Sequence, residues 1–219
     1  MPVREKFQFD LSELRKKVTE LGIFANEALR YSIEALETQD INNALEIIDN
    51  DTKADVLYEE INDFSILLIA KQQPVAIDLR RIIVAIKIAS DLERIADFAV
   101  NIAKSTIRIG KTELIDSIVP IREMFEKTSE MIQIAIEAFN EEDVTKANLV
   151  VDMDDAVDDY YGQIIKQLLH SSQDKLDTLP QITQLSFVCR YLERAADHTT
   201  NIAESVFYLI KGKHYEINS

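Results

Sequence analysis

Glycine and proline are scarce in this chain of 219 residues, with four of each, and tryptophan is absent. Tight turns between strands depend on glycine and proline, so a fold built from hairpins has little support. The chain is rich in Ala, Leu, Ile, Glu and Lys, which are strong helix formers. The composition therefore predicts an all-α protein.

Basic residues are also in the minority: 24 Lys and Arg stand against 39 Asp and Glu, which gives a net charge of −15. Nucleic-acid affinity rests largely on clustered Lys and Arg, so we expect no nucleic-acid partner. An anionic membrane surface would repel such a chain. We therefore expect contact with a membrane only through protein partners.

Cys189 is the only cysteine, and the N-terminus has neither a signal peptide nor an Arg-rich presequence. No apolar run approaches the roughly 20 residues that span a bilayer. These absences predict a soluble protein in the reducing cytoplasm. Cys189 itself has the spacing of a small core residue rather than the setting of a nucleophile.

Apolar residues recur with helical spacing in six segments. We place the helices near residues 8–37, 40–72, 75–109, 114–140, 142–170 and 177–211. Asp40 suits an N-cap, Pro74 a helix start and Gly110 a C-cap. Asp78 is interpreted as a further N-capping residue, although Arg80 and Arg81 after it have the chemistry to contact a partner or a phosphate.

One sequence block occurs twice. Leu92 to Asp97 read Leu-Glu-Arg-Ile-Ala-Asp, and Leu192 to Asp197 read Leu-Glu-Arg-Ala-Ala-Asp. Asn-Ile-Ala-x-Ser follows in both copies. The middle helices also match, with an offset of 103 residues. Short connections force successive helices to lie antiparallel. The chain is therefore predicted to form two tandem, pseudo-symmetric three-helix bundles, residues 1–110 and 111–219.

Each predicted bundle carries two acidic pairs spaced four residues apart, which places both carboxylates of a pair on one helix face. The pairs are Asp51 and Asp55, Glu93 and Asp97, Asp154 and Asp158, and Glu193 and Asp197. A hairpin about Pro74 places Asp51 opposite Asp97 and Asp55 opposite Glu93. A hairpin about Lys175 gives the same alignment in the second bundle.

Four carboxylates in one interhelical groove repel one another unless a cation compensates or some of them are protonated. Oxygen ligands suit iron, manganese, magnesium, calcium or zinc, and bridging carboxylates permit several ions at one site. Asn101 and Asn201, one turn further on, can orient a carboxylate or add an amide oxygen. His198 follows only the second motif, since Phe98 holds its place in the first.

Two less specific interpretations stay open. Acidic pairs are common on solvated helix faces, and the run from Asp152 to Asp159 is partly such a face. Arg94 and Arg194 also follow the two glutamates directly, so some of the carboxylates can belong to surface salt bridges instead of a metal site.

These motifs resemble the PhoU family of phosphate-transport accessory proteins. Pro74 to Arg80 read Pro-Val-Ala-x-Asp-Leu-Arg, Asp91 to Asp97 read Asp-Leu-Glu-Arg-Ile-Ala-Asp, and Arg190 to Glu204 continue the likeness. The resemblance implies two three-helix bundles that carry multinuclear iron or zinc clusters, bound through the eight acidic positions above. Two departures from the family pattern are Phe98 and the segment from Thr178 to Pro180.

The resemblance further implies a role without catalysis. Such a protein negatively regulates phosphate uptake and the phosphate-starvation response by linking a phosphate ABC transporter, through its ATPase subunit, to a sensor histidine kinase. A homodimer is possible. The rival classes are a helical scaffold without metal and a ferritin-like carboxylate oxidase. The oxidase needs Glu-x-x-His pairs, and none of His170, His198 and His214 has a glutamate three residues before it.

Overall fold

The computed structural model describes residues 3–115, 118–171 and 176–213. The α-helices are α1 (Val3–Thr38), α2 (Ile41–Asp49), α3 (Thr52–Gln72), α4 (Ala76–Ile109), α5 (Ile118–Glu141), α6 (Val144–Ser171) and α7 (Leu179–Lys211), with a 3-10 turn (Leu176–Thr178) before α7. These ranges contain no strand, which confirms the all-α prediction. The turn predicted at Lys175 lies outside the described residues.

The predicted helix boundaries agree with the local hydrogen bonds at two caps. The Asp40 carboxylate accepts from the backbone N–H groups of Asn42 and Asn43 at 3.0 and 3.2 Å, as an N-cap does. Gly110 ends α4 with a positive φ of 69°, a conformation that glycine adopts without steric cost. Pro74 lies just before α4, where Val75 holds the N-cap position.

Two local predictions are wrong. The single helix expected over residues 40–72 is interrupted between α2 and α3, at Asn50 and Asp51. Asn and Asp side chains compete with helical hydrogen bonds, and Asn50 donates from its side-chain amide to the Glu46 carbonyl at 2.8 Å. Asp78 is not an N-cap, because it lies inside the first turn of α4 and accepts from Arg81 at 3.0 Å.

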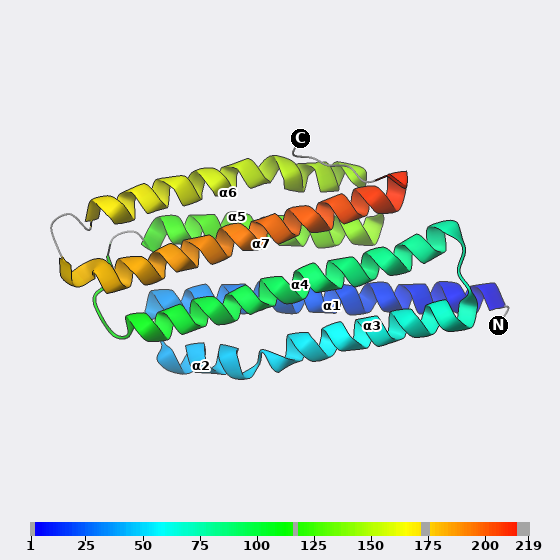
Figure 1. Ribbon diagram of the computed structural model, residues 1–219, viewed down its shortest axis with the longest axis horizontal. Coiled ribbons are helices and arrows are strands. Elements are labelled where there is room, and N and C mark those ends of the chain that lie inside the picture. Colours follow the sequence, from blue (N-terminus) through cyan, green and yellow to red (C-terminus); the bar gives the residue numbers. More distant parts are fainter. Residues whose placement is uncertain (1–2, 116–117, 172–175, 214–219) are drawn as a thin grey trace.

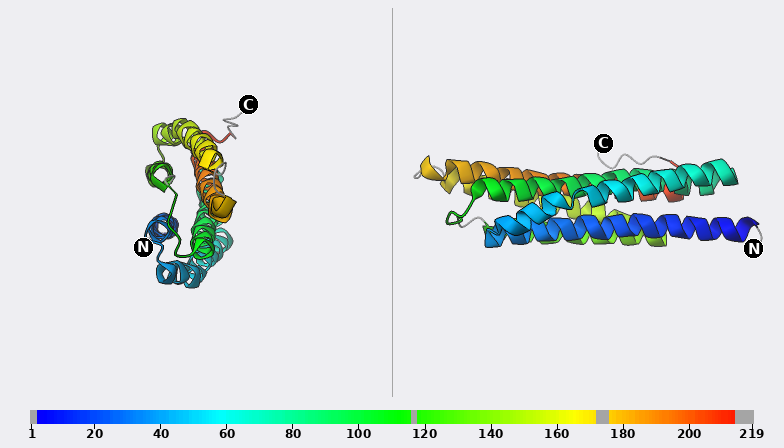
Figure 2. Two further views of the ribbon diagram at one scale, coloured as in Figure 1. Left: turned by 90° about the vertical axis from the view of Figure 1, so that its left-hand side faces the viewer. Right: turned by 90° about the horizontal axis from the view of Figure 1, so that it is seen from below.

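The helices form two layers (Figures 1 and 2). One layer runs α6, α7, α4 and α3, with α2 continuing the line of α3, and the other contains α5 and α1. The first repeat thus comprises α1 to α4 and the second α5 to α7. The long helices α4 and α7 lie side by side and antiparallel at the centre of the first layer (Figure 1). The predicted pair of three-helix bundles is confirmed.

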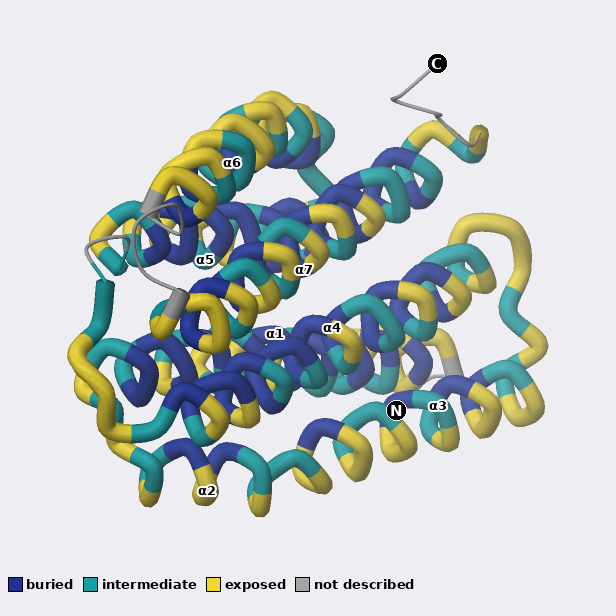
Figure 3. The backbone as a smooth tube through the Cα atoms, turned by 60° about the vertical axis from the view of Figure 1, so that its left-hand side comes forward, coloured by how far each residue is buried: buried dark blue, intermediate teal, exposed yellow. Residues whose placement is uncertain are grey.

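A continuous apolar core joins the two bundles. Leu92 of α4 and Leu192 of α7 are fully buried in the same cluster as Leu21 of α1 and Ile132 of α5. Buried positions follow the inner faces of all the long helices, while exposed positions lie on the outer faces of α3 and α6 (Figure 3). Gly22 of α1 touches Ile136 of α5 so closely that a Cβ atom there would clash. A larger residue at position 22 would therefore force the Ile136 side chain to move.

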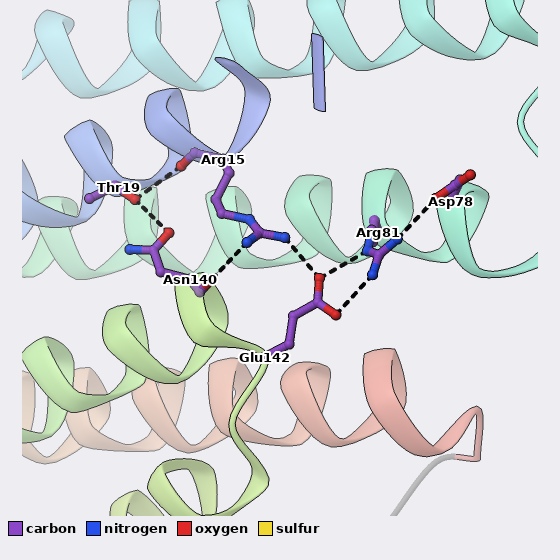
Figure 4. A network of polar contacts seen from close by, with 6 residues as sticks. All are labelled: Arg15, Thr19, Asp78, Arg81, Asn140 and Glu142. Carbon is purple, nitrogen blue, oxygen red and sulfur yellow. Dashed lines mark hydrogen bonds and ion pairs between the residues drawn. The ribbon is translucent and has the colours of Figure 1, made fainter. Parts of the chain in front are cut away.

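A polar network also connects the repeats (Figure 4). Glu142, in the turn between α5 and α6, accepts hydrogen bonds from Arg15 of α1 at 2.8 Å and from Arg81 of α4 at 2.9 and 3.0 Å. Arg15 also donates to the Asn140 carbonyl at 2.6 Å. The hydrogen bonds from Arg81 lower the pKa of Glu142. One carboxylate of the second repeat thus holds two arginines of the first.

None of the described helices combines the length and the low charge needed to cross a bilayer.

Candidate functional site: two acidic clusters

The first acidic cluster lies between α3 and α4. Asp51 stands at the break before α3, Asp55 is in the first turn of α3, and Glu93 and Asp97 lie one turn apart on α4. Burial raises the pKa of Glu93, and the charges of Asp97, Asp55 and Asp51 raise it further. Burial also raises the pKa of Asp51, helped by Asp97 and Asp55. The four carboxylates therefore share one electrostatic environment, as the hairpin geometry predicts.

The second cluster lies between α6 and α7 and repeats this arrangement. Burial, with the charges of Asp158 and Asp197, raises the pKa of Asp154 to about 6. The pKa of Asp158 is raised by its own burial and by Asp197. The pKa of Glu193 is raised by burial and then by Asp197. The predicted alignment of the second hairpin is therefore found as well.

Both clusters lie at the surface between two helices of one repeat, and their side chains are partly buried or exposed. The side chains of Glu93 and Glu193 are 16% and 13% exposed, whereas Asp55, Asp158 and Asp197 are exposed. Such a site gives a cation access from solvent, while the two glutamates are largely kept out of water.

An arginine adjoins each cluster, at a different position in the two repeats. Arg94 donates to Asp97 at 2.8 Å and lies 3.5 Å from a Glu93 oxygen. Arg190 pairs with Glu193. Arg194 instead lies over the Phe98 ring, 5.5 Å from its centroid. The salt-bridge interpretation is thus correct for Arg94 and not for Arg194, and Arg190 was missed although its three-residue spacing from Glu193 is a recognisable ion-pair signal.

Within the described ranges, no three His, Cys, Asp or Glu side chains are already arranged to hold a metal ion. The donor set nevertheless fits a hard cation, because four carboxylates gather at each partly buried site, where burial and then neighbouring carboxylates raise the pKa values of Asp51, Glu93, Asp154, Asp158 and Glu193. Coordination through the particular oxygens that Arg94 and Arg190 contact would require each arginine to release them.

The three supporting residues occupy different surroundings. Asn101 is half-buried one turn after Asp97, whereas Asn201 is exposed. His198 bonds through Nδ1 to Asp91 of α4 at 2.8 Å, so it lies in the interface between α4 and α7. At the pseudo-symmetric position, Phe98 stacks on Tyr191 with ring centroids 6.2 Å apart. The departure at Phe98 thus concerns the contact between α4 and α7.

Cys189 is fully buried, and burial raises the pKa of its thiol to about 12. Its interpretation as a core residue is confirmed.

Comparisons with known proteins agree with this architecture. The family model of the PhoU domain matches residues 18–106 and again residues 121–206. The phosphate-specific transport system accessory protein PhoU homolog of Clostridium acetobutylicum is 41% identical over 216 residues, which cover 98% of this chain and 99% of that protein. The corresponding homolog of Zymomonas mobilis is 34% identical over 94% of this chain and 87% of its own length.

Solved structures give the same result. The phosphate transport system regulatory protein PhoU from Streptococcus pneumoniae superposes with a TM-score of 0.90 at 27% identity, covering 96% of this chain and all of that one. PhoU from Pseudomonas aeruginosa superposes with a TM-score of 0.89 at 28% identity, covering 94% of this chain and all of that one.

The fold and the clusters define an all-α protein of two repeated bundles, each with an acidic cluster between its last two long helices. The family model and the relatives identify this class: the chain belongs to the PhoU family.

Proposed function

We propose that the protein is a cytoplasmic accessory protein of a phosphate transport system, which restrains phosphate uptake and phosphate-starvation signalling. The observation that carries this proposal is the double PhoU domain, together with a relative of that description aligned over nearly the whole of both chains. It acts by binding proteins and not by catalysis. Its partners are the ATPase subunit of a phosphate ABC transporter and a sensor histidine kinase.

The experiment that tests this role is a deletion of the gene in its host, followed by complementation. Expression of a phosphate-starvation reporter and uptake of radiolabelled phosphate are measured in phosphate-rich medium. Loss of the protein should raise both, and the wild-type gene should restore them. A deletion strain with unchanged reporter and uptake would refute the proposal. Co-purification of the ATPase subunit and of the kinase with the tagged protein then tests each partner separately.

We further propose that both acidic clusters bind metal ions, with several ions in each cluster. Iron or zinc suits the family resemblance, and manganese or magnesium suits the oxygen ligands equally. Bound cations would neutralise carboxylates whose pKa values burial and mutual repulsion have raised. Asp51, Asp55, Glu93 and Asp97 would serve the first cluster, and Asp154, Asp158, Glu193 and Asp197 the second.

Elemental analysis of protein purified without chelator tests the metal proposal, and anomalous scattering from crystals identifies the ion at each cluster. A metal-free scaffold remains the second candidate, because Arg94 and Arg190 already compensate part of the negative charge. Protein that binds neither iron, zinc, manganese nor magnesium would favour that scaffold. A ferritin-like oxidase has less support, since His198 is engaged with Asp91.

A further inference from the structure

An apolar groove runs along the outer edge of the first repeat, between α1 and α3. One hollow of about 510 Å³ is lined by Ile23, Phe24, Val56 and Leu57, with Glu20 and Glu27 on the α1 rim and Lys53 on the α3 rim. A second hollow continues it towards Tyr31 and Ile47 and shares Phe24, Glu27 and Lys53 with the first. Ile23 and Val56 are 53% and 52% exposed, so the groove presents large aliphatic side chains to solvent.

The fold itself does not require apolar residues at three of the four positions that define this groove, as the second repeat shows, whereas the fourth position, Leu57, corresponds to Tyr160. With the offset of 103 residues, Ile23 corresponds to Glu126, Phe24 to Lys127 and Val56 to Asp159. The three second-repeat positions have the same burial as their first-repeat counterparts. The second repeat therefore accommodates charged side chains at these three positions, and the exposed apolar residues of the first repeat call for another explanation.

The shape of the groove suits a helix. From Glu20 to Tyr31 it follows twelve residues of α1, a rise of roughly 16 Å or three helical turns. An amphipathic helix of that length presents apolar residues at i, i+4, i+7 and i+11, which match a shallow apolar groove. Polar neighbours beside that stripe would meet the rims.

The charged residues on the rims indicate which charges the docked helix should have. Among the described residues, neither Glu20 nor Glu27 has an ion-pair partner, whereas Lys17 and Arg30 nearby are paired with Glu60 and Glu34. Two uncompensated carboxylates on the α1 rim, in a chain with net charge −15, favour basic residues beside the apolar stripe. Lys53 on the α3 rim can pair with an acidic residue on the opposite edge of the bound helix.

We propose that this groove, defined by Ile23, Phe24, Val56 and Leu57, docks a basic amphipathic helix of a partner protein. A second copy of this chain is a poorer occupant, because two copies that each carry a net charge of −15 repel one another. An anionic lipid surface would meet the same repulsion. The inference rests on the proposed function only in one respect: a protein that acts by binding other proteins needs a surface for a partner.

A designed peptide supplies the test. The probe is a fluorescein-labelled, 16-residue helix with leucines on one face and lysines flanking them, and a peptide of the same composition with scattered leucines is the control. Fluorescence anisotropy should detect saturable binding of the amphipathic peptide to the full chain. The double substitution Ile23→Ser with Val56→Glu should weaken it at least about tenfold. Ile66→Glu, an exposed position on α3 outside the groove, should leave it unchanged.

Site-specific labelling locates the bound peptide. Cys189 is buried and its thiol pKa is raised, so Val56→Cys provides the one readily reactive thiol for an environment-sensitive dye. The amphipathic peptide should shift the emission of this dye to the blue, whereas the same dye at Ile66→Cys should not respond. Circular dichroism and the melting temperature show that each variant is folded before binding is compared.

Several results would overturn the docking proposal. They are equal binding of both peptides, binding that survives the groove substitutions, or a dye response at both positions. Sedimentation that shows a dimer lost with Ile23→Ser and Val56→Glu would make the groove a self-association surface, and binding to phosphatidylglycerol vesicles would make it a membrane surface. None of these results would change the outcome of the deletion and complementation experiment. The docking proposal can therefore fail while the proposed function stands.

Discussion

At the turn after the first helix of each repeat, the backbone conformation is the same and the side chain differs. Gln39 and Glu142 both have φ of 52°, and the next residue, Asp40 or Asp143, caps the following helix in both. Gln39 donates to the Gly110 carbonyl and so holds the linker between the repeats. Glu142 binds Arg15 and Arg81 across the interface. The two repeats thus share the backbone conformation of this turn, while the side chain at the equivalent position contacts the linker in one repeat and the other repeat's arginines in the second.

The acidic clusters differ in a similar way. Asp51 lies at a break between two helices, whereas its counterpart Asp154 lies inside the continuous helix α6. Asp155 adds its charge near Asp154 and Asp158. The second cluster is therefore the more negative of the two. We expect it to bind the first equivalent of metal.

The largest expected effect is on metal content, which should distinguish the two clusters. Glu93→Ala with Asp97→Ala should abolish metal at the first cluster, and Glu193→Ala with Asp197→Ala at the second, each lowering the total metal of fully loaded protein by about half. Elemental analysis of the purified variants measures this. Glu59→Ala with Asp63→Ala is the matched control, since this exposed pair on α3 has the same spacing. Metal content unaffected by either cluster variant would contradict the assignment.

The second effect concerns the two equivalent turn residues. Glu142→Ala leaves two partly buried arginines without their shared carboxylate and should cost about 2–3 kcal/mol of unfolding free energy. Gln39→Ala removes neutral hydrogen bonds and should cost about 1 kcal/mol or less. Urea denaturation at pH 7 compares them. Because the pKa of Glu142 is lowered, its contribution is present at neutral pH and is lost as the pH falls through that lowered value. Equal costs for the two substitutions would contradict the comparison.

A third effect tests the crowding of charge in the second cluster. The folded-state pKa of Asp154 is about 6 against an ordinary 3.8, so ionisation of this group destabilises the metal-free fold above that window. Asp154→Asn should raise the neutral-pH stability of metal-free protein by about 1 kcal/mol, since the group is only partly buried and solvent screens part of the repulsion. The gain should vanish as the pH falls below that window. Thermal melts of chelator-treated protein from pH 4 to 8 follow the difference.

Much of this architecture is predictable from sequence because the determinants are periodic. Helical spacing and the duplicated motif give two three-helix bundles, and the numbering of each hairpin places Asp51 near Asp97 and Asp158 near Glu193. These inferences require only helix geometry. The break at Asn50 was missed because apolar spacing continues across it, while the competing hydrogen bonds of Asn50 leave little trace in the pattern.

The contacts between repeats were beyond prediction from spacing alone. Nothing in the local sequence pairs Glu142 with Arg15 and Arg81, since those partners lie more than sixty residues away and become neighbours only once the bundles are docked. The contact of His198 was also unpredictable. Its position directly after Asp197 suggested a role in the second cluster, whereas its ring bonds to Asp91 of α4. Long-range packing decides both.

The smallest expected effect tests whether the two halves of the α4–α7 interface are interchangeable. His198 pairs with Asp91 at the position where Phe98 stacks on Tyr191. His198→Phe alone should cost about 1 kcal/mol, because Asp91 loses its partner in a half-buried setting. Adding Asp91→Tyr should restore most of that loss by rebuilding the stacked pair of the other half, and a double-mutant cycle in urea measures the coupling. Additive costs would mean that the aromatic pair depends on its own surroundings, such as Arg194 over Phe98.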